Sequence, residues 1–344
     1  MELKEALFYK PIKSKGKDKS DDKIVQCKLC PRFCLIKNTE RGNCGTRTNM
    51  DGTLYSLVYG KPCSLSIDPI EKKPFYNFLP GSKSLSIATT GCNLHCLHCQ
   101  NSQISQARFE DVPHLEASPE SVVQQAKSNN AKSISFTYSE PIISYEYIMD
   151  IAKLAKKSKI KCNIVSNGYI NQAPLKKLVP YIKAANIDLK GNSLFYEKIC
   201  DAKIEPVLET IKFLKKKGVW LELTYLVIPG YNDSIEEIKT TIAWIKDNLG
   251  LDAPLHFSAF YPCYKLMNAP ATAPEFLIKA RIIAKQQGLK FVYTGNIQDE
   301  EGSTTYCPNC NRAVIKRRSV FITENNLKRG KCRFCKNPVP GIWQ

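Results

Sequence analysis

Three cysteines at residues 92–99 form the stretch with the clearest potential for chemistry. Cys92, Cys96 and Cys99 stand four and three positions apart, directly after an alternating run at 84–90 that predicts a strand. Three thiolates can bind three irons of a [4Fe–4S] cluster and leave the fourth iron open, as catalytic metal sites generally keep an open position. The same cysteines are also compatible with a tetrahedral zinc site. The spacing therefore predicts a metal centre with two alternatives for its identity.

Polar residues follow three of the next predicted strands. Glu140 lies in Thr-Tyr-Ser-Glu-Pro, Ser166 and Asn167 precede a glycine, and Asp188 is separated from Lys190 by one residue. A carboxylate fixed at a strand end is a suitable partner for a cation, and hydroxyl and amide side chains can bind sugar hydroxyls. Taken alone, each segment is more typical of a turn or a helix start. Their order after successive strands, together with the cysteines, favours the cluster over zinc.

Strand-like and helix-like stretches alternate through the middle of the chain. Ser118-Pro-Glu predicts a helix with proline at its first position, and Ser234-Ile-Glu-Glu predicts a capping box. Repeated strand–helix–strand units imply parallel strands with right-handed crossovers. The expected fold class is α/β, a partial (β/α)6 TIM-type barrel with chemistry at the carboxyl ends of its strands. The strands are expected at 84–90, 133–138, 161–165, 184–189, 219–228, 255–260 and 291–293.

The pattern C-x3-C-x2-C is the signature of the radical S-adenosylmethionine (radical SAM) enzymes, and the chain resembles them here. The context at residues 91–101 is similar to the branch that contains the activating enzymes of glycyl-radical enzymes. His98 stands where the family usually has tyrosine or phenylalanine, and it keeps a flat ring at that position. Val165 stands where the activating enzymes have aspartate, so a monovalent-cation site is not expected.

This resemblance implies a function and roles for the polar residues. A [4Fe–4S] cluster on the three cysteines is expected to bind SAM and cleave it reductively to methionine and a 5′-deoxyadenosyl radical. The radical then takes hydrogen from a small molecule or a protein residue, and the electron comes from a reductant such as ferredoxin or flavodoxin. Glu140 is expected at the ammonium group of SAM, Ser166 and Asn167 near its ribose, and Asp188 and Lys190 near the cofactor.

Two further groups of cysteines flank the predicted barrel. The N-terminal group lies within eighteen residues, and zinc or a second [4Fe–4S] cluster both fit its spacing. The C-terminal group consists of two Cys-x-x-Cys pairs joined by a strand-rich link at 314–323, which predicts a zinc ribbon, with a redox iron as the alternative. The groups are Cys27, Cys30, Cys34 and Cys44, and Cys307, Cys310, Cys332 and Cys335. No role is assigned to the isolated Cys63, Cys162, Cys200 and Cys263.

Motifs along nearly the whole chain resemble the radical SAM enzyme of the AmmeMemoRadiSam system. They are a Cys-x-Leu-Cys-Pro-Arg-x-Cys opening, Asp-Pro-Ile-Glu-Lys-Lys-Pro, Pro-Leu-His-Phe-Ser, Tyr-Thr-Gly-Asn and Cys-Pro-Asn-Cys, which begin at Cys27, Asp68, Pro254, Tyr293 and Cys307. This resemblance implies Memo-like and AMMECR-like proteins as functional partners. It does not identify the substrate.

The length and composition of the chain limit the number of domains that it can form. The 344 residues, 43% of them hydrophobic, suit one large domain with appendages. We expect a flexible basic lead-in over 1–24, a cysteine-rich module with short strands over 25–80, the barrel over 81–298 and the zinc-ribbon-like module over 299–344. The segment 67–75 is expected as a fixed loop, either solvated or in contact with substrate, and His256 as a core histidine.

The net charge and the distribution of cysteines indicate which partners and which cellular compartment to expect. The formal charge is +18, and lysines are spread over many segments, which favours a solvated surface over nucleic-acid binding. Eleven of the fifteen cysteines are grouped and no apolar run reaches membrane-spanning length, so metal ligation in the cytoplasm is expected. The alternatives are a radical SAM enzyme that modifies RNA and an iron–sulfur electron carrier without a substrate.

Overall fold

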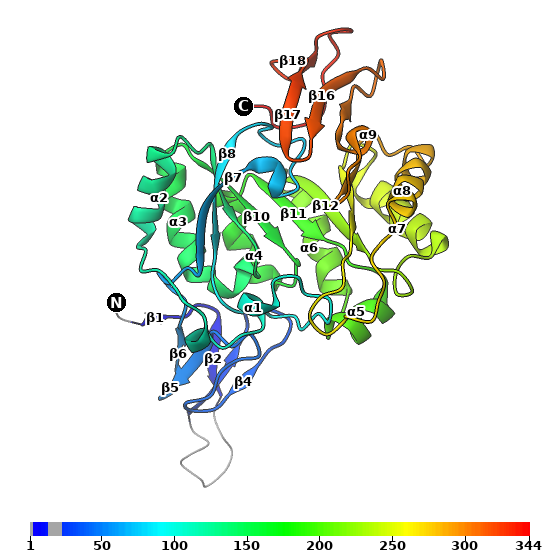
Figure 1. The fold of residues 1–344 in the computed structure, drawn as a ribbon. Coiled ribbons are helices and arrows are strands. Elements are labelled where there is room, and N and C mark those ends of the chain that lie inside the picture. Colours follow the sequence, from blue (N-terminus) through cyan, green and yellow to red (C-terminus); the bar gives the residue numbers. More distant parts are fainter. Residues whose placement is uncertain (1–2, 13–22) are drawn as a thin grey trace.

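The computed structural model describes residues 3–12 and 23–344, and one eight-stranded sheet forms the centre of this part (Figure 1). Its strand order is β14-β13-β12-β11-β10-β9-β8-β7. Strands β8 to β14 pair in parallel, and β7 pairs antiparallel to β8 at one edge. The strands are β7 (Ser64–Pro69), β8 (Lys83–Ala88), β9 (Ser133–Phe136), β10 (Lys161–Ser166), β11 (Ala184–Asp188), β12 (Trp220–Val227), β13 (Leu255–Ala259) and β14 (Val292–Gly295).

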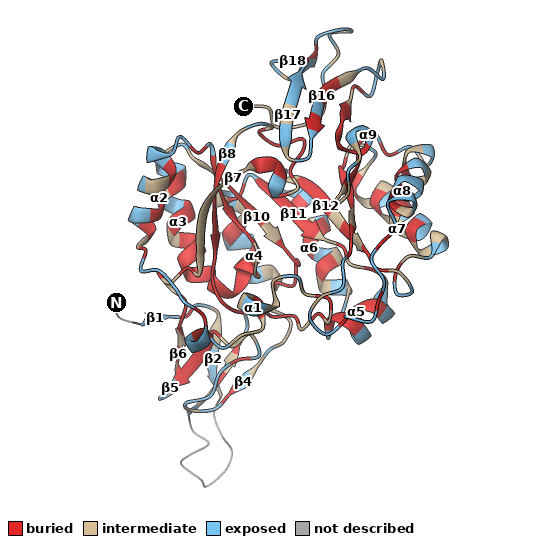
Figure 2. Cartoon of the chain, viewed as in Figure 1, coloured by how far each residue is buried: buried red, intermediate tan, exposed pale blue. Residues whose placement is uncertain are grey.

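Helices between the parallel strands pack against the sheet, and most residues of strands β8 to β14 are buried (Figure 2). The Ser118 hydroxyl caps α2 as expected, and the Ser234 hydroxyl caps α7 by accepting from the Glu237 N–H. The second half of the capping box is absent, because the Glu237 carboxylate accepts from Asn192 instead. The helices are α1 (Ser102–Ser105), α2 (Pro119–Ser128), α3 (Tyr145–Lys157), α4 (Gln172–Leu178), α5 (Ser193–Cys200), α6 (Glu205–Lys216), α7 (Ile235–Leu249) and α8 (Pro274–Gln286).

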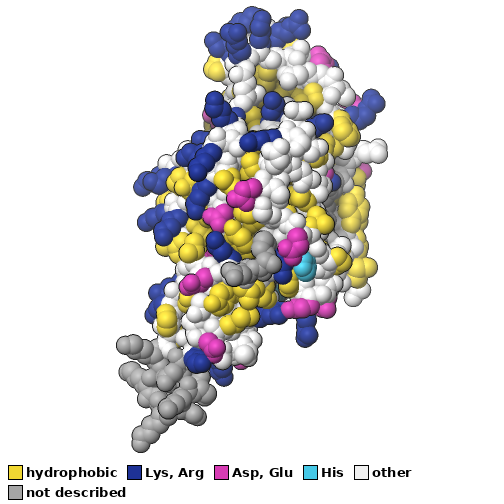
Figure 3. All heavy atoms as spheres, turned by 90° about the vertical axis from the view of Figure 1, so that its left-hand side faces the viewer, with side chains coloured by type: hydrophobic (Ala, Val, Ile, Leu, Met, Phe, Trp, Pro, Cys, Tyr) yellow, Lys and Arg dark blue, Asp and Glu magenta, His cyan; other side chains and the backbone are white. Residues whose placement is uncertain are grey.

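This arrangement confirms the partial barrel of α/β class. Each expected barrel strand is present within a few residues of its predicted bounds, and the strands at the two edges, β7 and β14, do not pair with each other in the described residues. Among those residues, no helix has both the length and the apolar character needed to cross a membrane. On the face shown in Figure 3, lysine and arginine side chains stand in separate groups with acidic and apolar side chains between them.

Two small sheets form the N-terminal module, which lies at the carboxyl end of the barrel strands near α1 (Figure 1). One sheet has the order β1-β6-β5 and the other β2-β3-β4. The strands are β1 (Lys4–Glu5), β2 (Tyr9–Ile12), β3 (Ile24–Cys27), β4 (Leu35–Ile36), β5 (Arg47–Met50) and β6 (Thr53–Ser56). The expectation of a flexible lead-in over 1–24 is wrong for residues 4–5 and 9–12, which form strands β1 and β2. The basic centre of the expected lead-in, at 13–20, lies outside the described residues.

The segment 67–75 differs from the expected loop. It forms the end of edge strand β7 and the short 3₁₀ helix η2 (Ile70–Lys72), and Asp68, Glu71 and Lys73 are buried. Burial is possible because each charge has a partner: the Lys73 ammonium lies 2.8 Å from Asp68, and Glu71 pairs with Arg317. A solvated loop is therefore wrong for this segment.

The C-terminal module projects from the other end of the barrel (Figure 1). Arg317 joins it to the barrel: its guanidinium donates to the Tyr76 carbonyl at 2.7 Å, lies 3.4 Å from the Glu71 carboxylate and covers the Tyr76 ring. The module's elements are α9 (Glu300–Ser303), β15 (Thr305–Tyr306), β16 (Ala313–Arg318), β17 (Phe321–Asn325), β18 (Leu327–Lys328) and β19 (Lys331–Cys332).

We predict that Arg317→Met destabilises the fold by about 3–5 kcal/mol, because it leaves the Glu71 carboxylate buried without its charge partner. The neighbouring Arg318→Met is the matched control, since the Arg318 side chain is 82% exposed whereas that of Arg317 is 0% exposed. The measurement is the free energy of unfolding in denaturant. Equal effects of the two substitutions would contradict a specific role of Arg317.

Candidate active site

The polar strand ends and the three cysteines meet in one cavity of about 430 Å³ at the carboxyl end of the barrel. This volume lies within the usual range for sites that bind a cofactor or small ligand. Every residue predicted for the cluster and for SAM contributes to the lining: Cys92, Cys96, Cys99, Glu140, Ser166, Asn167, Asp188 and Lys190. These residues come from the loop after β8 and from the ends of β9, β10 and β11.

The cysteine loop, between β8 and α1, is shaped by hydrogen bonds to its sulfurs. The Leu94 N–H lies 3.4 Å from the Cys92 Sγ, and the Ser105 hydroxyl lies 3.0 Å from the Cys99 Sγ. Burial raises the pKa of Cys92 and of Cys99, so thiolates at these positions require a compensating positive charge. Irons of a cluster supply that charge, and the donor set therefore fits a [4Fe–4S] group.

Cys200 lies beside this loop, although its isolated place in the sequence suggests no role for it. Atoms of Cys96, His98 and Cys200 lie within 4.8 Å of one another, and the hydrogen bond from Cys200 lowers the pKa of Cys96. The loop rests on the end of α5, where the Leu97 N–H donates to the Ile199 carbonyl at 2.9 Å. No local pattern marks Cys200, because its partner is about a hundred positions away in the sequence.

His98 occupies a buried position next to a positive charge. Burial lowers the pKa of His98 to about 3, with a further contribution from the Lys190 ammonium, so its ring is neutral. The ring lies 5.6 Å from that of Phe195. His98 thus provides a neutral planar side chain at the position where the family usually has another aromatic ring.

Glu140 joins the ends of two strands through one buried carboxylate. Its Oε1 accepts from the Ser166 hydroxyl at 2.8 Å and the Ile142 N–H at 3.0 Å, and its Oε2 accepts from the Asn167 N–H at 2.8 Å. Burial raises the pKa of Glu140 to about 7, while these donors act in the opposite direction. The carboxylate has acceptor capacity left for one more donor, because its two oxygens offer about four acceptor sites.

Ser166 and Asn167 are engaged within the protein. The Ser166 hydroxyl donates to Glu140 and accepts from the Gly168 N–H at 3.0 Å. The Asn167 amide donates to the Asn93 side chain at 2.9 Å and accepts from the Tyr169 N–H at 2.8 Å. Both side chains therefore fix the loop after β10, and their contact with a ribose stays a prediction.

Asp188 and Lys190 form an ion pair of 2.7 Å at the end of β11, the strand next to β10. Burial alone would lower the pKa of Lys190, but Asp188 and the nearby Cys96 raise it well above its ordinary value. Lys190 therefore places a permanent positive charge next to the cysteine loop. His256 also reaches the cavity, and it is buried with its Nε2 2.7 Å from the Glu222 carboxylate, as expected for a core histidine; a contact with substrate stays a prediction.

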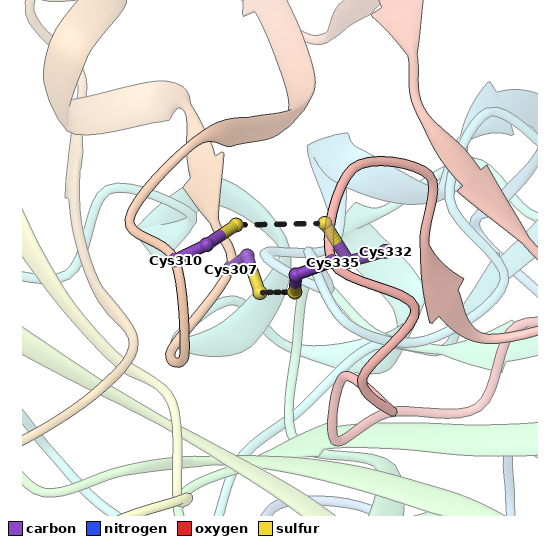
Figure 4. A group of neighbouring side chains, drawn as sticks. All are labelled: Cys307, Cys310, Cys332 and Cys335. Atoms are coloured by element: carbon purple, nitrogen blue, oxygen red, sulfur yellow. Dashed lines mark hydrogen bonds between the residues drawn. The ribbon is translucent and has the colours of Figure 1, made fainter.

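The four C-terminal cysteines face one another in pairs (Figure 4). The Sγ atoms of Cys307 and Cys335 lie 3.6 Å apart, those of Cys310 and Cys332 lie 3.8 Å apart, and all four lie within 4.8 Å. Four thiolates at the tetrahedral distance from one zinc ion stand about 3.8 Å from each other. The arrangement fits a single tetrahedral metal ion.

Comparisons with known proteins agree with this geometry. A sequence model of the radical SAM superfamily matches residues 86–245. The chain is 45% identical over 339 residues to the uncharacterized protein MJ0808 of Methanocaldococcus jannaschii, covering 98% of this chain and 99% of that protein. It is 26% identical over 218 residues to pyruvate formate-lyase 1-activating enzyme of Escherichia coli, covering 59% of this chain and 89% of the relative.

Two solved structures share the fold at low sequence identity. Streptococcus suis SuiB bound to S-adenosylmethionine has a TM-score of 0.50 and 15% identity, covering 66% of this chain and 53% of SuiB. A radical SAM methyltransferase from Sphaerobacter thermophilus has a TM-score of 0.51 and 12% identity, covering 84% of this chain and 78% of that protein.

We predict that Gly91→Ala disrupts the cysteine loop. Gly91 has a φ of +102°, and an added Cβ would lie 2.6 Å from the Cys44 carbonyl oxygen and against the Thr46 methyl group. Such overpacking costs about 1–3 kcal/mol and displaces the residue that precedes Cys92. The measurement is the iron bound after anaerobic reconstitution, which should fall.

Gly230→Ala provides the control for backbone strain alone. Gly230 has a φ of +79°, but an added Cβ meets nothing within 4 Å. Its iron content should equal that of the unchanged protein. Full iron loading of Gly91→Ala would show that the close approach to Cys44 does not matter for the loop.

Proposed function

Because the chain belongs to the radical SAM superfamily, and to the same family as the Methanocaldococcus jannaschii protein, we propose that it cleaves SAM reductively at a [4Fe–4S] cluster held by Cys92, Cys96 and Cys99. The observation that carries this proposal is the meeting of these cysteines with Glu140, Ser166, Asn167, Asp188 and Lys190 in one cavity. When bound, the cluster and SAM supply a 5′-deoxyadenosyl radical that takes hydrogen from the substrate.

The chain's own residues hold and orient the cofactor in this proposal. Glu140 uses its remaining acceptor capacity for the amino group of SAM, at a position fixed by the ends of β9 and β10. Lys190 offsets the negative charge of the thiolates and is itself oriented by Asp188. Ser166 and Asn167 keep the loop after β10 in the shape that lines the cavity.

The rest of the cavity supports a polar substrate. Away from the cysteines, its lining includes the side chains of Lys72, Tyr138, Thr224, Ser258 and Thr294. The Lys72 ammonium lies 2.9 Å from Asp68, and the Tyr138 hydroxyl donates to the same carboxylate at 2.7 Å. These hydroxyl and charged groups suit a polar small molecule or a polar residue of a protein substrate, in keeping with an activating-enzyme-like activity.

The wider motif pattern extends the proposal to partners and metals. The motifs beginning at Cys27, Asp68, Pro254, Tyr293 and Cys307 support membership of the AmmeMemoRadiSam system, with Memo-like and AMMECR-like proteins as partners. A one-electron reductant such as ferredoxin or flavodoxin supplies the electron. The C-terminal cysteines bind zinc, since their sulfur spacing suits one tetrahedral ion.

We expect the reconstituted protein to form 5′-deoxyadenosine from SAM under anaerobic reduction with dithionite. Cys96→Ala should abolish the product, because it removes a ligand of the cluster. Cys63→Ser is the matched control, since Cys63 lies outside the cavity lining and its thiol donates to the Ala88 carbonyl. Product formation by Cys96→Ala, or its absence from the iron-loaded unchanged protein given reductant and polar candidate substrates, would contradict the proposal.

Glu140→Gln tests the cofactor contact separately. The amide keeps the shape of the side chain but loses its charge, and exchanging a charge-assisted for a neutral hydrogen bond costs about 1 kcal/mol or more. SAM binding, measured by equilibrium dialysis of reconstituted protein, should weaken by roughly tenfold. The exposed Glu197→Gln should bind SAM unchanged, and equal affinities of the two variants would exclude Glu140 as a cofactor contact.

A further inference from the structure

The four cysteines of the N-terminal module surround a small enclosed cavity of their own. Cys27, Cys30, Cys34 and Cys44 line it together with apolar side chains and two arginines, Arg32 and Arg47. The cysteines come from β3, from the turn that follows it and from the loop before β5. Four thiols directed at one cavity form a built ligand set, whose occupant depends on the distances between the sulfurs.

The sulfur spacing differs from that of the C-terminal site. Within the described ranges 3–12 and 23–344, groups of three or more ligand atoms within 4.8 Å of one another occur at the four C-terminal cysteines and at Cys96, His98 and Cys200, but not among the four N-terminal cysteines. One zinc ion needs sulfurs about 3.8 Å apart. In a [4Fe–4S] cluster each thiolate binds a different iron, so the sulfurs stand further apart around a central space. The N-terminal set has the wider arrangement.

Hydrogen-bond donors are directed at three of these sulfurs. The Asn43 N–H lies 3.4 Å from Cys34 Sγ, the Thr46 hydroxyl 3.4 Å from Cys44 Sγ, and the Arg47 guanidinium 3.8 Å from Cys27 Sγ. Arg47 is buried and held in place by an ion pair with Glu146. Such donors stabilise anionic sulfur and are one of the ways in which a protein sets the potential of an iron–sulfur cluster.

The module is packed directly against the cysteine loop of the barrel. The Cys44 carbonyl approaches Gly91, which is covalently bonded to Cys92. The Arg32 guanidinium donates to the Asn93 carbonyl at 2.9 Å, and Asn93 also lines the N-terminal cavity. At these contacts, only one or two residues separate the N-terminal cysteines from the barrel cysteines.

We propose that Cys27, Cys30, Cys34 and Cys44 bind a second [4Fe–4S] cluster, and that this cluster passes electrons to the cluster held by Cys92, Cys96 and Cys99. The relay rests on the proposed function, whereas the metal assignment does not. An external one-electron donor of the flavodoxin or ferredoxin class reduces the N-terminal cluster. The same electron then moves to the barrel cluster, so each transfer oxidises one centre and reduces the next without moving an atom.

The position of the N-terminal set suits an entry point for electrons. Cys30, Cys34 and Cys44 are only partly buried, and the neighbouring Phe33 is exposed. The barrel cysteines lie between the N-terminal module and the strand ends, where Cys92 and Cys99 are likewise partly buried and Cys96 is buried. A donor that docks on the N-terminal module therefore meets the N-terminal cluster before the one that faces SAM.

Metal analysis of two variants tests the assignment. The triple variant Cys92→Ala/Cys96→Ala/Cys99→Ala should retain about four irons and about four sulfides per chain after reconstitution, together with about one zinc. Cys30→Ala/Cys34→Ala should lose the N-terminal iron and keep that of the barrel, and Cys63→Ser should match the unchanged protein. A triple variant that contains no iron and a second zinc would overturn the proposal.

Electron paramagnetic resonance tests the relay without requiring SAM cleavage. Two reduced clusters in contact broaden each other's signals, so the spectrum of the unchanged protein should differ from the sum of the two variants' spectra. Reduction of the barrel cluster by reduced flavodoxin should be slowed in Cys30→Ala/Cys34→Ala, while reduction by dithionite serves as the reference. A purely additive spectrum with an unchanged rate of reduction by flavodoxin would overturn the relay.

These measurements keep the two proposals distinguishable. Iron, sulfide and spectra report on the clusters even if no 5′-deoxyadenosine is formed, in which case the proposed function fails and the second cluster stands. Conversely, product formation by a protein that carries zinc in the N-terminal module leaves the proposed function intact and removes the second cluster.

Discussion

The buried carboxylate of Glu140 holds the candidate site together, because its hydrogen-bond donors come from the ends of two different strands. Glu140 lies in the loop after β9, and its carboxylate accepts three hydrogen bonds, from the Ile142 N–H, the Ser166 hydroxyl and the Asn167 N–H. Asn167 continues the connection to Asn93, next to Cys92. Because a buried carboxylate is costly without such partners, the ends of β9 and β10 and the cysteine loop are fixed relative to one another. The rigid positions that a cluster and its ligand require follow from this network.

Two buried arginines attach the flanking modules to opposite ends of the barrel. Arg47 from β5 pairs with Glu146 of α3, and Arg317 from β16 pairs with Glu71 of η2. In each case the guanidinium pairs with a carboxylate of the larger domain and also donates to a carbonyl of its own module, that of Leu7 for Arg47 and that of Ser303 for Arg317. A small module has little core of its own, so such fixed contacts and its metal site account for its order. The N-terminal module is thereby held against the loop that carries Cys92.

The sequence allowed the barrel and its site to be predicted because both depend on local patterns. Alternation of strands and helices gave the fold class, and polar residues directly after strands marked the cavity, since parallel strands bring their carboxyl ends to one edge. The contacts that were missed depend on distant pairs. Cys200 meets Cys96 only through the docking of α5. The charges at 67–75 were expected either in solvent or in contact with substrate, because Arg317, the distant partner of Glu71, cannot be inferred from the segment itself.

The two four-cysteine sites show that the spacing of cysteines in the sequence does not decide which metal they bind. Both sets begin with Cys-x-x-Cys, and thiolate ligands alone suit zinc and iron–sulfur clusters equally. The distinction arises from tertiary structure. In the C-terminal module, two separate knuckles bring their sulfurs to within 4.8 Å, whereas in the N-terminal module the chain spreads its sulfurs around a cavity that also touches Asn93. One zinc ion needs four sulfurs close together, whereas a cluster provides one iron for each sulfur, so the wider arrangement supports the proposed second cluster. The loop that carries Cys44 also packs against Gly91, and Arg32 donates to the Asn93 carbonyl, so the segments that arrange these sulfurs also hold the N-terminal site next to the barrel cysteines.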